Sequence, residues 1–130
     1  LRCQVTERDK VKMYWGYEVK EATSLQKLLK SLNADISILT SRKGRPLADL
    51  WQNLVTDIQH AHKILVVFGA PKSGVNEILQ KDNVNPKDLS KYVLNILQEQ
   101  GSATIRTEEA LLGTLAILNL AKIIHNQVAF

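Results

Sequence analysis

The run "KILVVFGAPKSG" (63–74) decides the fold class of this chain. Its first half, residues 63–68, is a continuous apolar stretch rich in β-branched residues, which is typical of a strand covered on both faces. Its second half contains two glycines and a proline, which predict a tight loop. We therefore expect residues 63–68 to be the central strand of a sheet and the loop to emerge at its carboxyl end.

Strand and helix patterns alternate on both sides of this run. The predicted strands span 12–20, 35–41, 63–68 and 92–97, and the predicted helices span 25–32, 46–58, 75–80 and 107–127. Ser24 is the expected N-cap of the first helix, and Pro46 suits the first turn of the second. The segments "RKGRP" (42–46) and "KDNVNPKD" (81–88) are expected to be a turn and a polar connection. The alternation predicts an α/β fold with a mostly parallel sheet and helices on both faces.

Length and composition limit the classes of protein. The 130 residues suffice for one domain with a core, and the apolar content of 45% with 23% charged residues excludes a disordered or fibrous class. The formal net charge of +4 permits a polyanionic partner. A single cysteine, Cys3, suits a reducing compartment, and no apolar run is long enough to span a bilayer. We expect a cytoplasmic protein with no membrane association.

Three predicted loops follow strands and contain glycine. They span 40–46, 69–74 and 98–106. The carboxyl ends of parallel strands lie along one edge of a sheet, where ligands bind. Glycine allows close approach of backbone to a ligand, although it also serves tight turns alone. The residues by themselves therefore predict a ligand-binding edge without identifying the ligand.

The sequence lacks the residues that several common cofactor-binding and catalytic motifs require. The 69–76 loop has Val75 and Asn76 where a nucleotide-binding P-loop requires lysine and serine or threonine. No G-x-G-x-x-G follows a strand, and no nucleophile elbow is present. His60, His62 and His125 do not have metal-site spacing, so we expect no metal.

Five motifs occur in order along the chain: "YWGYEV" (14–19), "SLQKLL" (24–29), "ILTSRKGRP" (38–46), "VVFGAPKSGVNEIL" (66–79) and "QGSATIRTEEALLGTLAILN" (100–119). Together they resemble the archaeal and eukaryotic RNA methyltransferase family of the SPOUT superfamily. The resemblance implies a parallel α/β fold with a deep C-terminal trefoil knot. It also implies transfer of a methyl group from S-adenosylmethionine to RNA, without a metal.

The resemblance also implies which residues hold the cofactor and the RNA. The expected cofactor residues are Thr40, Ser41, Phe68, Gly69, Ala70, Asn95, Ile96, Leu97, Gln100, Gly101, Thr104 and Ile105. Arg106 and Arg42 are the expected catalytic residues, because a guanidinium can orient phosphate or stabilise charge on the acceptor. RNA is expected to contact Arg42, Lys43, Arg45 and Lys72. The structural alternative for Arg42, Lys43 and Arg45 is a solvated turn without a binding role. For Arg106 it is an ion pair with Glu109.

The last predicted helix has two further features. Thr107 can cap its amino end, and Glu108 and Glu109 in its first turn complement the helix dipole. The helix is apolar nearly all round, and Gly113 in its interior favours the close approach of another helix. With the resemblance, this predicts a homodimer through the last helix.

The expected domain organisation has two parts. Residues 1–12 form a polar segment, which the resemblance relates to the end of an inserted β-barrel, and residues 13–130 form the methyltransferase domain. Compared with other family members, this domain is expected either to be part of a longer protein or to have an abbreviated sheet. A non-catalytic RNA-binding or scaffold protein with the same fold is the alternative function. A receiver-like signalling domain is disfavoured because no acidic cluster lies at the strand ends.

Overall fold

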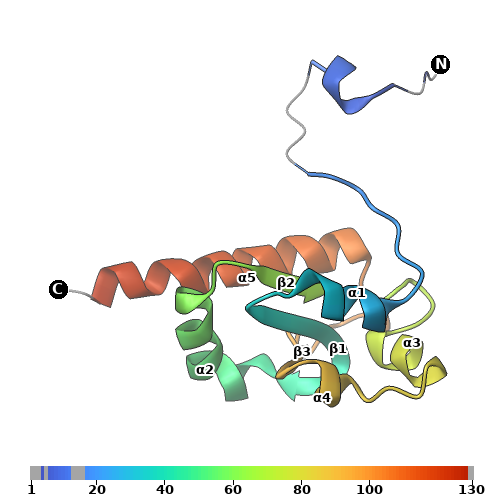
Figure 1. The fold of residues 1–130 in the computed structure, drawn as a ribbon. Coiled ribbons are helices and arrows are strands. Elements are labelled where there is room, and N and C mark those ends of the chain that lie inside the picture. Colours follow the sequence, from blue (N-terminus) through green and yellow to red (C-terminus); the bar gives the residue numbers. More distant parts are fainter. Residues whose placement is uncertain (1–3, 5, 13–16, 129–130) are drawn as a thin grey trace.

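The alternation of strands and helices is present in the computed structural model, which describes residues 4, 6–12 and 17–128. A short 3-10 helix at Arg8–Lys10 precedes the other elements. In chain order these are α1 (Leu25–Leu32), β1 (Ile36–Pro46), α2 (Leu47–His60), β2 (Ile64–Val67), α3 (Val75–Lys81), α4 (Pro86–Leu89), β3 (Tyr92–Asn95) and α5 (Thr107–Val128). Figure 1 shows the helices around the sheet and residues 17–24 leading away from it. None of the helices in the described ranges could span a membrane.

The strands form a parallel sheet in the order β2-β1-β3. Ile36 pairs with Ile64 at one end of the β1–β2 ladder, and Ile38 pairs with Tyr92 at the start of the β1–β3 ladder. Every strand therefore ends at the same edge of the sheet. This arrangement confirms the predicted parallel α/β class.

Each face of the sheet buries its own apolar cluster. Because side chains alternate along a strand, Ile38 and Leu94 face α2 and α5, whereas Leu39 faces α1 and α3. The helices supply Leu54 and Ile58 to the first cluster and Leu29, Val75 and Leu79 to the second. The resulting three layers hold the sheet rigid beneath the loops at its carboxyl edge (Figure 1).

The order of the strands corrects one prediction. Among the described strands β1 is central, and β2, predicted as the central strand, lies at an edge and is only half-buried. An apolar run indicates a strand covered on both faces but not its lateral position, because helices cover both faces of an edge strand as well.

The segment 42–46, predicted as a turn, continues β1. The pairing with β3 shifts between Thr40 and Arg45, so that both Thr40 and Arg45 oppose Leu94. Residues 41–44 therefore bulge out of the ladder, and Gly44 lies directly against the backbone of β3. A Cβ atom on Gly44 would be 2.7 Å from the carbonyl carbon of Leu94, which explains the glycine by close approach and not by a turn.

Other boundaries differ in smaller ways. Part of the strand predicted at 12–20, residues 13–16, lies outside the described residues, and residues 17–20 form no strand, so this prediction is wrong there.

The polar connection contains the short helix α4, which Asn85 caps by accepting a hydrogen bond from Lys87 N–H at 3.0 Å. The predicted strand 92–97 ends two residues earlier, at Asn95. The N-cap role of Ser24 is confirmed.

A polar network supports the amino end of the sheet. The buried Tyr92 donates its hydroxyl hydrogen to Asp57 Oδ2 at 2.6 Å, and Lys91 Nζ lies 2.6 Å from the same oxygen. The hydrogen bond from Lys91 and then that from Tyr92 lower the pKa of Asp57 below its ordinary value of 3.8. Burial raises the pKa of Tyr92 above its ordinary value of 10.0. This network joins α2 to β3 at the end of the sheet opposite its carboxyl edge.

The lowered pKa of Asp57 predicts a pH-dependent contribution to stability. A carboxyl whose folded-state pKa is lowered stabilises the fold above its unfolded pKa and loses this contribution as the pH falls through the folded value. We expect Asp57→Asn to lower the free energy of unfolding by about 1–2 kcal/mol at pH 7, and the deficit to shrink below about pH 4. Urea denaturation at a series of pH values measures this, with Asp49→Asn on the exposed face of α2 as the matched control. An Asp57→Asn deficit that is constant down to pH 3 would contradict this assignment.

Candidate functional site

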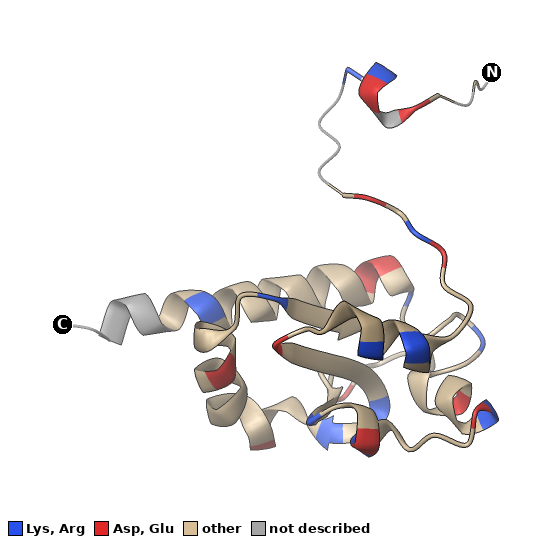
Figure 2. Ribbon diagram, in the orientation of Figure 1, with Lys and Arg blue, Asp and Glu red and all other residues tan. Residues whose placement is uncertain are grey.

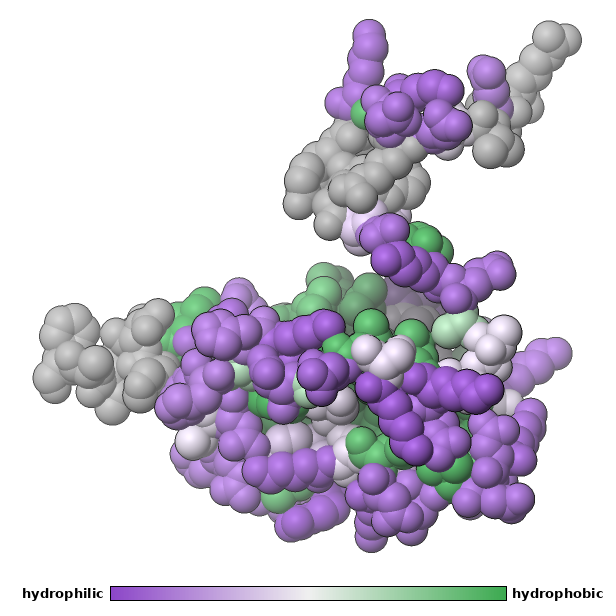
Figure 3. All heavy atoms as spheres, viewed as in Figure 1, coloured by the Kyte–Doolittle hydropathy of each residue, from purple (hydrophilic) through white to green (hydrophobic). Residues whose placement is uncertain are grey.

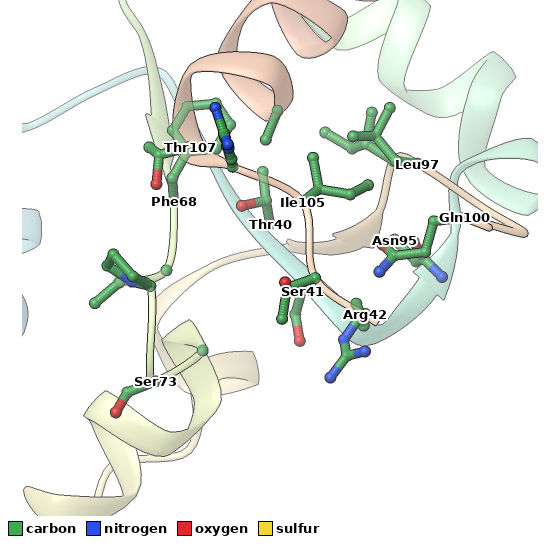
Figure 4. A pocket seen from close by; sticks show the side chains of 18 of the residues that line it. Thr40, Ser41, Arg42, Phe68, Ser73, Asn95, Leu97, Gln100, Ile105 and Thr107 are labelled. Atoms are coloured by element: carbon green, nitrogen blue, oxygen red, sulfur yellow. The ribbon is translucent and has the colours of Figure 1, made fainter. Parts of the chain in front are cut away.

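A cavity of about 500 Å³ opens at the carboxyl edge of the sheet. Its walls come from the end of β1, the β2–α3 loop, the β3–α5 loop and the first two turns of α5. In Figure 4, Phe68 and Thr107 lie at one end, Asn95 and Gln100 at the other, and Ile105 between them. The volume is in the range of small-molecule and cofactor sites.

Side-chain hydrogen bonds fasten the walls together. Thr40 Oγ1 donates to the carbonyl oxygen of Val67 at 2.8 Å, which ties the ends of β1 and β2. Arg42 Nη1 donates to the carbonyl oxygen of Ala103, and Gln100 Nε2 donates to that of Ser102 at 2.9 Å. The β3–α5 loop is therefore held in place from β1 and from within.

The β2–α3 loop is closed by its own backbone. Ala70 N–H donates to Ser73 O at 2.8 Å and Ser73 N–H donates to Ala70 O at 3.2 Å. The carboxylate of Glu77 accepts from Gly74 N–H at 2.9 Å and lies 3.9 Å from Lys43 Nζ. Glu77 is thus committed to capping α3 and pairing with β1.

The amino end of α5 forms the wall nearest solvent. The carboxylate of Glu109 accepts from Arg106 N–H at 3.2 Å, so Glu109 caps the helix that Thr107 begins. Within the described part of the chain the Arg106 guanidinium makes no ion pair, and neither does the exposed Glu108. One turn further along α5, a Cβ atom added to Gly113 would lie 3.3 Å from Cδ2 of Leu97. The glycine therefore allows the Leu97 side chain to pack against the helix. The close neighbour of Gly113 is therefore a side chain of the β3–α5 loop and not the helix that the sequence predicted.

One buried polar atom at the cavity lacks a partner. Asn76 Oδ1 is inaccessible to solvent and accepts no hydrogen bond from any described residue, and Asn76 lines the cavity. Buried acceptors are normally satisfied, so a bound molecule that reaches this wall with a donor group would complete the hydrogen bonding of Asn76. A ligand with N–H or O–H groups fits this requirement.

The charge around the cavity is mainly positive. The charged lining residues are Arg42, Lys43, Lys72, Glu77, Arg106 and Glu108. Figure 2 shows basic residues at the end of β1 and directly before the acidic first turn of α5. In the described ranges no cluster of three metal-ligating side chains exists. His125 and Cys3 fall outside the described side chains.

The cavity brings most of the predicted site residues together. All the predicted cofactor residues except Gly101 line it, as do Arg106, Arg42, Lys43 and Lys72. Gly101 faces open space, and Arg45 pairs with Leu94 in the ladder outside the cavity. The main lining residues that the sequence prediction omitted are Ser73, Asn76 and Glu77 at α3 and Glu108, Ala110 and Thr114 on α5. The "SGVNE" run at 73–77 carried a signal for the first three, because it places the start of a helix directly after a strand-end loop.

Comparison with known proteins places the chain in a sequence family. The family described as "Putative RNA methyltransferase" matches residues 3–118, a range that includes every lining residue of the cavity. The chain is 37% identical over 114 residues to a protein of Drosophila melanogaster named 28S rRNA (uridine-N(3))-methyltransferase. It is 34% identical over 118 residues to the protein of the same name in Homo sapiens and 32% identical over 118 residues to an uncharacterised protein of Halobacterium salinarum.

The shared region is a part of these relatives. The matches cover 82% of this chain and 22% of the Drosophila protein, 85% and 30% for the human protein, and 82% and 41% for the archaeal one. The chain therefore spans less than a third of the length of the two eukaryotic relatives.

Proposed function

The chain belongs to this RNA methyltransferase family, and we propose that it transfers a methyl group from S-adenosylmethionine to N3 of a uridine in ribosomal RNA. The observation that carries the proposal is the cavity at the carboxyl edge of the sheet, all of whose walls lie within the family match. The names of the eukaryotic relatives support the acceptor atom and the class of RNA.

The cavity fits the proposed cofactor in size and in chemistry. Its lining is mixed, with apolar side chains from Phe68, Leu97 and Ile105 and polar ones from Thr40 and Asn95. The orphaned acceptor of Asn76 matches a molecule that carries amino and hydroxyl donors, as S-adenosylmethionine does. When bound, this cofactor supplies an electrophilic methyl group on a sulfonium.

The residues of the chain then align the acceptor. Arg42 and Gln100 hold the β3–α5 loop in one arrangement, so the cavity is preorganised. Arg106 and Lys72 are exposed at the mouth, where they can bind phosphate or carry charge that develops on the acceptor base. Alignment of donor and acceptor accounts for about 7–11 kcal/mol of barrier reduction in favourable intramolecular cases.

We propose the SPOUT arrangement for the finer architecture, with the β3–α5 loop as part of a trefoil knot. The resemblance of the motif at 100–119 supports this topology. The parallel sheet and the loop that wraps the cavity before α5 are compatible with it. The cytoplasm is the compartment that we propose, from the lone cysteine.

We propose that the protein acts as a homodimer through α5. Leu112, Leu115 and Ile123 on this helix are 73%, 51% and 45% exposed, and Figure 3 shows apolar atoms along the upper edge of the sheet domain, where α5 lies. An apolar stripe of this kind on a soluble protein marks an interaction surface. We expect light scattering at micromolar concentration to give a dimer for the wild type and a monomer for Leu112→Glu. A monomeric wild type would contradict the homodimer.

Filling the cavity tests the proposed cofactor site. Ala110 is half-buried in the cavity wall, so the side chain introduced by Ala110→Phe occupies space that the ligand needs. We expect this variant to bind S-adenosylmethionine at least about tenfold more weakly, a loss of about 1.4 kcal/mol. Titration calorimetry measures the affinity, and Ala48→Phe on the exposed start of α2 is the matched control. Equal affinities for both variants would place the cofactor elsewhere.

A further inference from the structure

The proposed reaction raises a chemical requirement that the cavity must meet. Uracil N3 carries a proton at neutral pH, and its lone pair is delocalised into the two flanking carbonyl groups. Methylation at N3 therefore requires that this proton leaves before or during transfer. A group that accepts a proton must lie where the base enters, which is the solvent-facing mouth of the cavity.

Few lining residues can accept a proton near pH 7. Among the described residues the lining contains no histidine, and lysine and arginine side chains are hydrogen-bond donors without an acceptor. The two carboxylates are Glu77 and Glu108. One oxygen of Glu77 accepts the N–H of Gly74, and the other lies 3.9 Å from the cationic Lys43 Nζ, so Glu77 already serves the start of α3. Glu108 is therefore the carboxylate of the lining that is free to act.

Glu108 also differs from its neighbour in the same turn. Glu109 accepts a hydrogen bond from Arg106 N–H and so carries the capping role. Glu108 is exposed and, among the described residues, makes neither a hydrogen bond nor an ion pair. Glu108 lines the cavity, and an acid that only stabilised the helix would not need to do so. The helix dipole stabilises its charge without using its oxygens.

We infer that Glu108 is the general base that takes the N3 proton of the acceptor uracil; the inference rests on the proposed function. The N3–H bond breaks and its proton passes to a carboxylate oxygen of Glu108. The electron pair of the N3–H bond stays on N3 and forms the new bond to the methyl carbon, and the electrons of the carbon–sulfur bond remain on sulfur, which leaves as a neutral thioether. Arg106, two residues earlier, carries the charge that develops on the uracil oxygens.

The test compares Glu108→Gln with the matched control Glu109→Gln. Glutamine serves as a capping residue at this position as well as glutamate does, so the control keeps the helix cap and changes the same charge one residue away. Both variants and the wild type are assayed in single turnovers on a transcript of large-subunit ribosomal RNA. The assay is run from pH 6 to pH 9, and also with a transcript in which 5-fluorouridine replaces uridine.

We expect Glu108→Gln to transfer methyl about 100-fold more slowly than wild type at pH 6.5. Its rate should rise about tenfold per pH unit, because ionisation of uracil in solution replaces the lost base. The deficit should also shrink on 5-fluorouridine, whose N3 is more acidic. Glu109→Gln should follow the wild-type profile. The other charged lining groups, Arg42, Lys43, Lys72, Glu77 and Arg106, are identical in all three proteins, so they cannot produce this difference.

A binding measurement without cofactor gives an independent readout. The wild type should bind a uridine hexanucleotide more tightly than its N3-methylated counterpart, because Glu108 accepts the N3–H hydrogen bond. Glu108→Ala should lose this preference. A Glu108→Gln variant with wild-type rate and pH profile, or a preference that persists in Glu108→Ala, would overturn the assignment of Glu108. Absence of methyl transfer by the wild type would instead overturn the proposed function, and this assignment with it.

Discussion

Gly44→Ala is expected to lower the free energy of unfolding by about 3 kcal/mol, the upper end of the usual cost of overpacking. The added methyl group would lie 2.7 Å from both the carbonyl carbon of Leu94 and the carbonyl oxygen of Val93. These are backbone atoms of β3, so they cannot rotate away, and the strand itself must move. β3 ends at Asn95, and both Asn95 and the following Leu97 line the cavity, so we expect weaker cofactor binding as well.

Chemical denaturation measures this effect, and the chain offers a matched control. A methyl group on Gly101 would meet no atom of the described residues within 4 Å, and the φ of this glycine is not positive. Gly101→Ala should therefore be neutral or slightly stabilising, by up to about 1 kcal/mol, through the reduced entropy of the unfolded chain. Equal stabilities for the two variants would show that Gly44 of β1 does not lie as close to the backbone of β3 as described.

Arg106→Ala is expected to lower the rate of methyl transfer by well over tenfold, a loss above about 1.4 kcal/mol of transition-state stabilisation. The guanidinium is exposed at the mouth of the cavity, and among the described residues it pairs with no carboxylate. The contact with Glu109 uses the backbone N–H of Arg106, which alanine retains. Thermal stability should therefore change little.

Arg45→Ala separates catalysis from general attraction to RNA. Arg45 is exposed but lies outside the cavity, so its loss should weaken RNA binding and flatten its salt dependence without changing the single-turnover rate at saturating RNA. Near-normal single-turnover transfer by Arg106→Ala would contradict a catalytic role for Arg106.

The parts of the fold that sequence reasoning predicted are those with a local cause. The spacing of Leu25, Leu28 and Leu29 after Ser24 defines α1 with its cap, and the β-branched run at 63–68 contains β2. Lateral strand order has no such local cause, because both β1 and β2 read as buried strands. The sequence prediction therefore placed the centre of the sheet at β2, whereas it lies at β1.

The failure at 42–46 has a specific reason. Glycine followed closely by proline is the usual signature of a turn, but here Gly44 permits close contact with the backbone of β3 and Pro46 precedes α2. For the candidate site, the positions of the three glycine-containing loops were predicted from the strand ends alone. The proposed cofactor, S-adenosylmethionine, came only from the resemblance to the RNA methyltransferase family. The role inferred for Glu108 rests on the hydrogen bonds that Glu77 and Glu109 already accept from backbone N–H groups. The spacing of residues in the sequence does not reveal these hydrogen bonds.

The central claim is transfer of a methyl group to N3 of uridine, and analysis of the product nucleoside tests it most directly. The chain is incubated with S-adenosylmethionine carrying an isotopically labelled methyl group and with ribosomal RNA, and the RNA is then digested to nucleosides for mass spectrometry. The account predicts labelled 3-methyluridine. Unlabelled RNA despite measurable cofactor binding, which is the behaviour of a non-catalytic scaffold, or label on a ribose or another base, would contradict it.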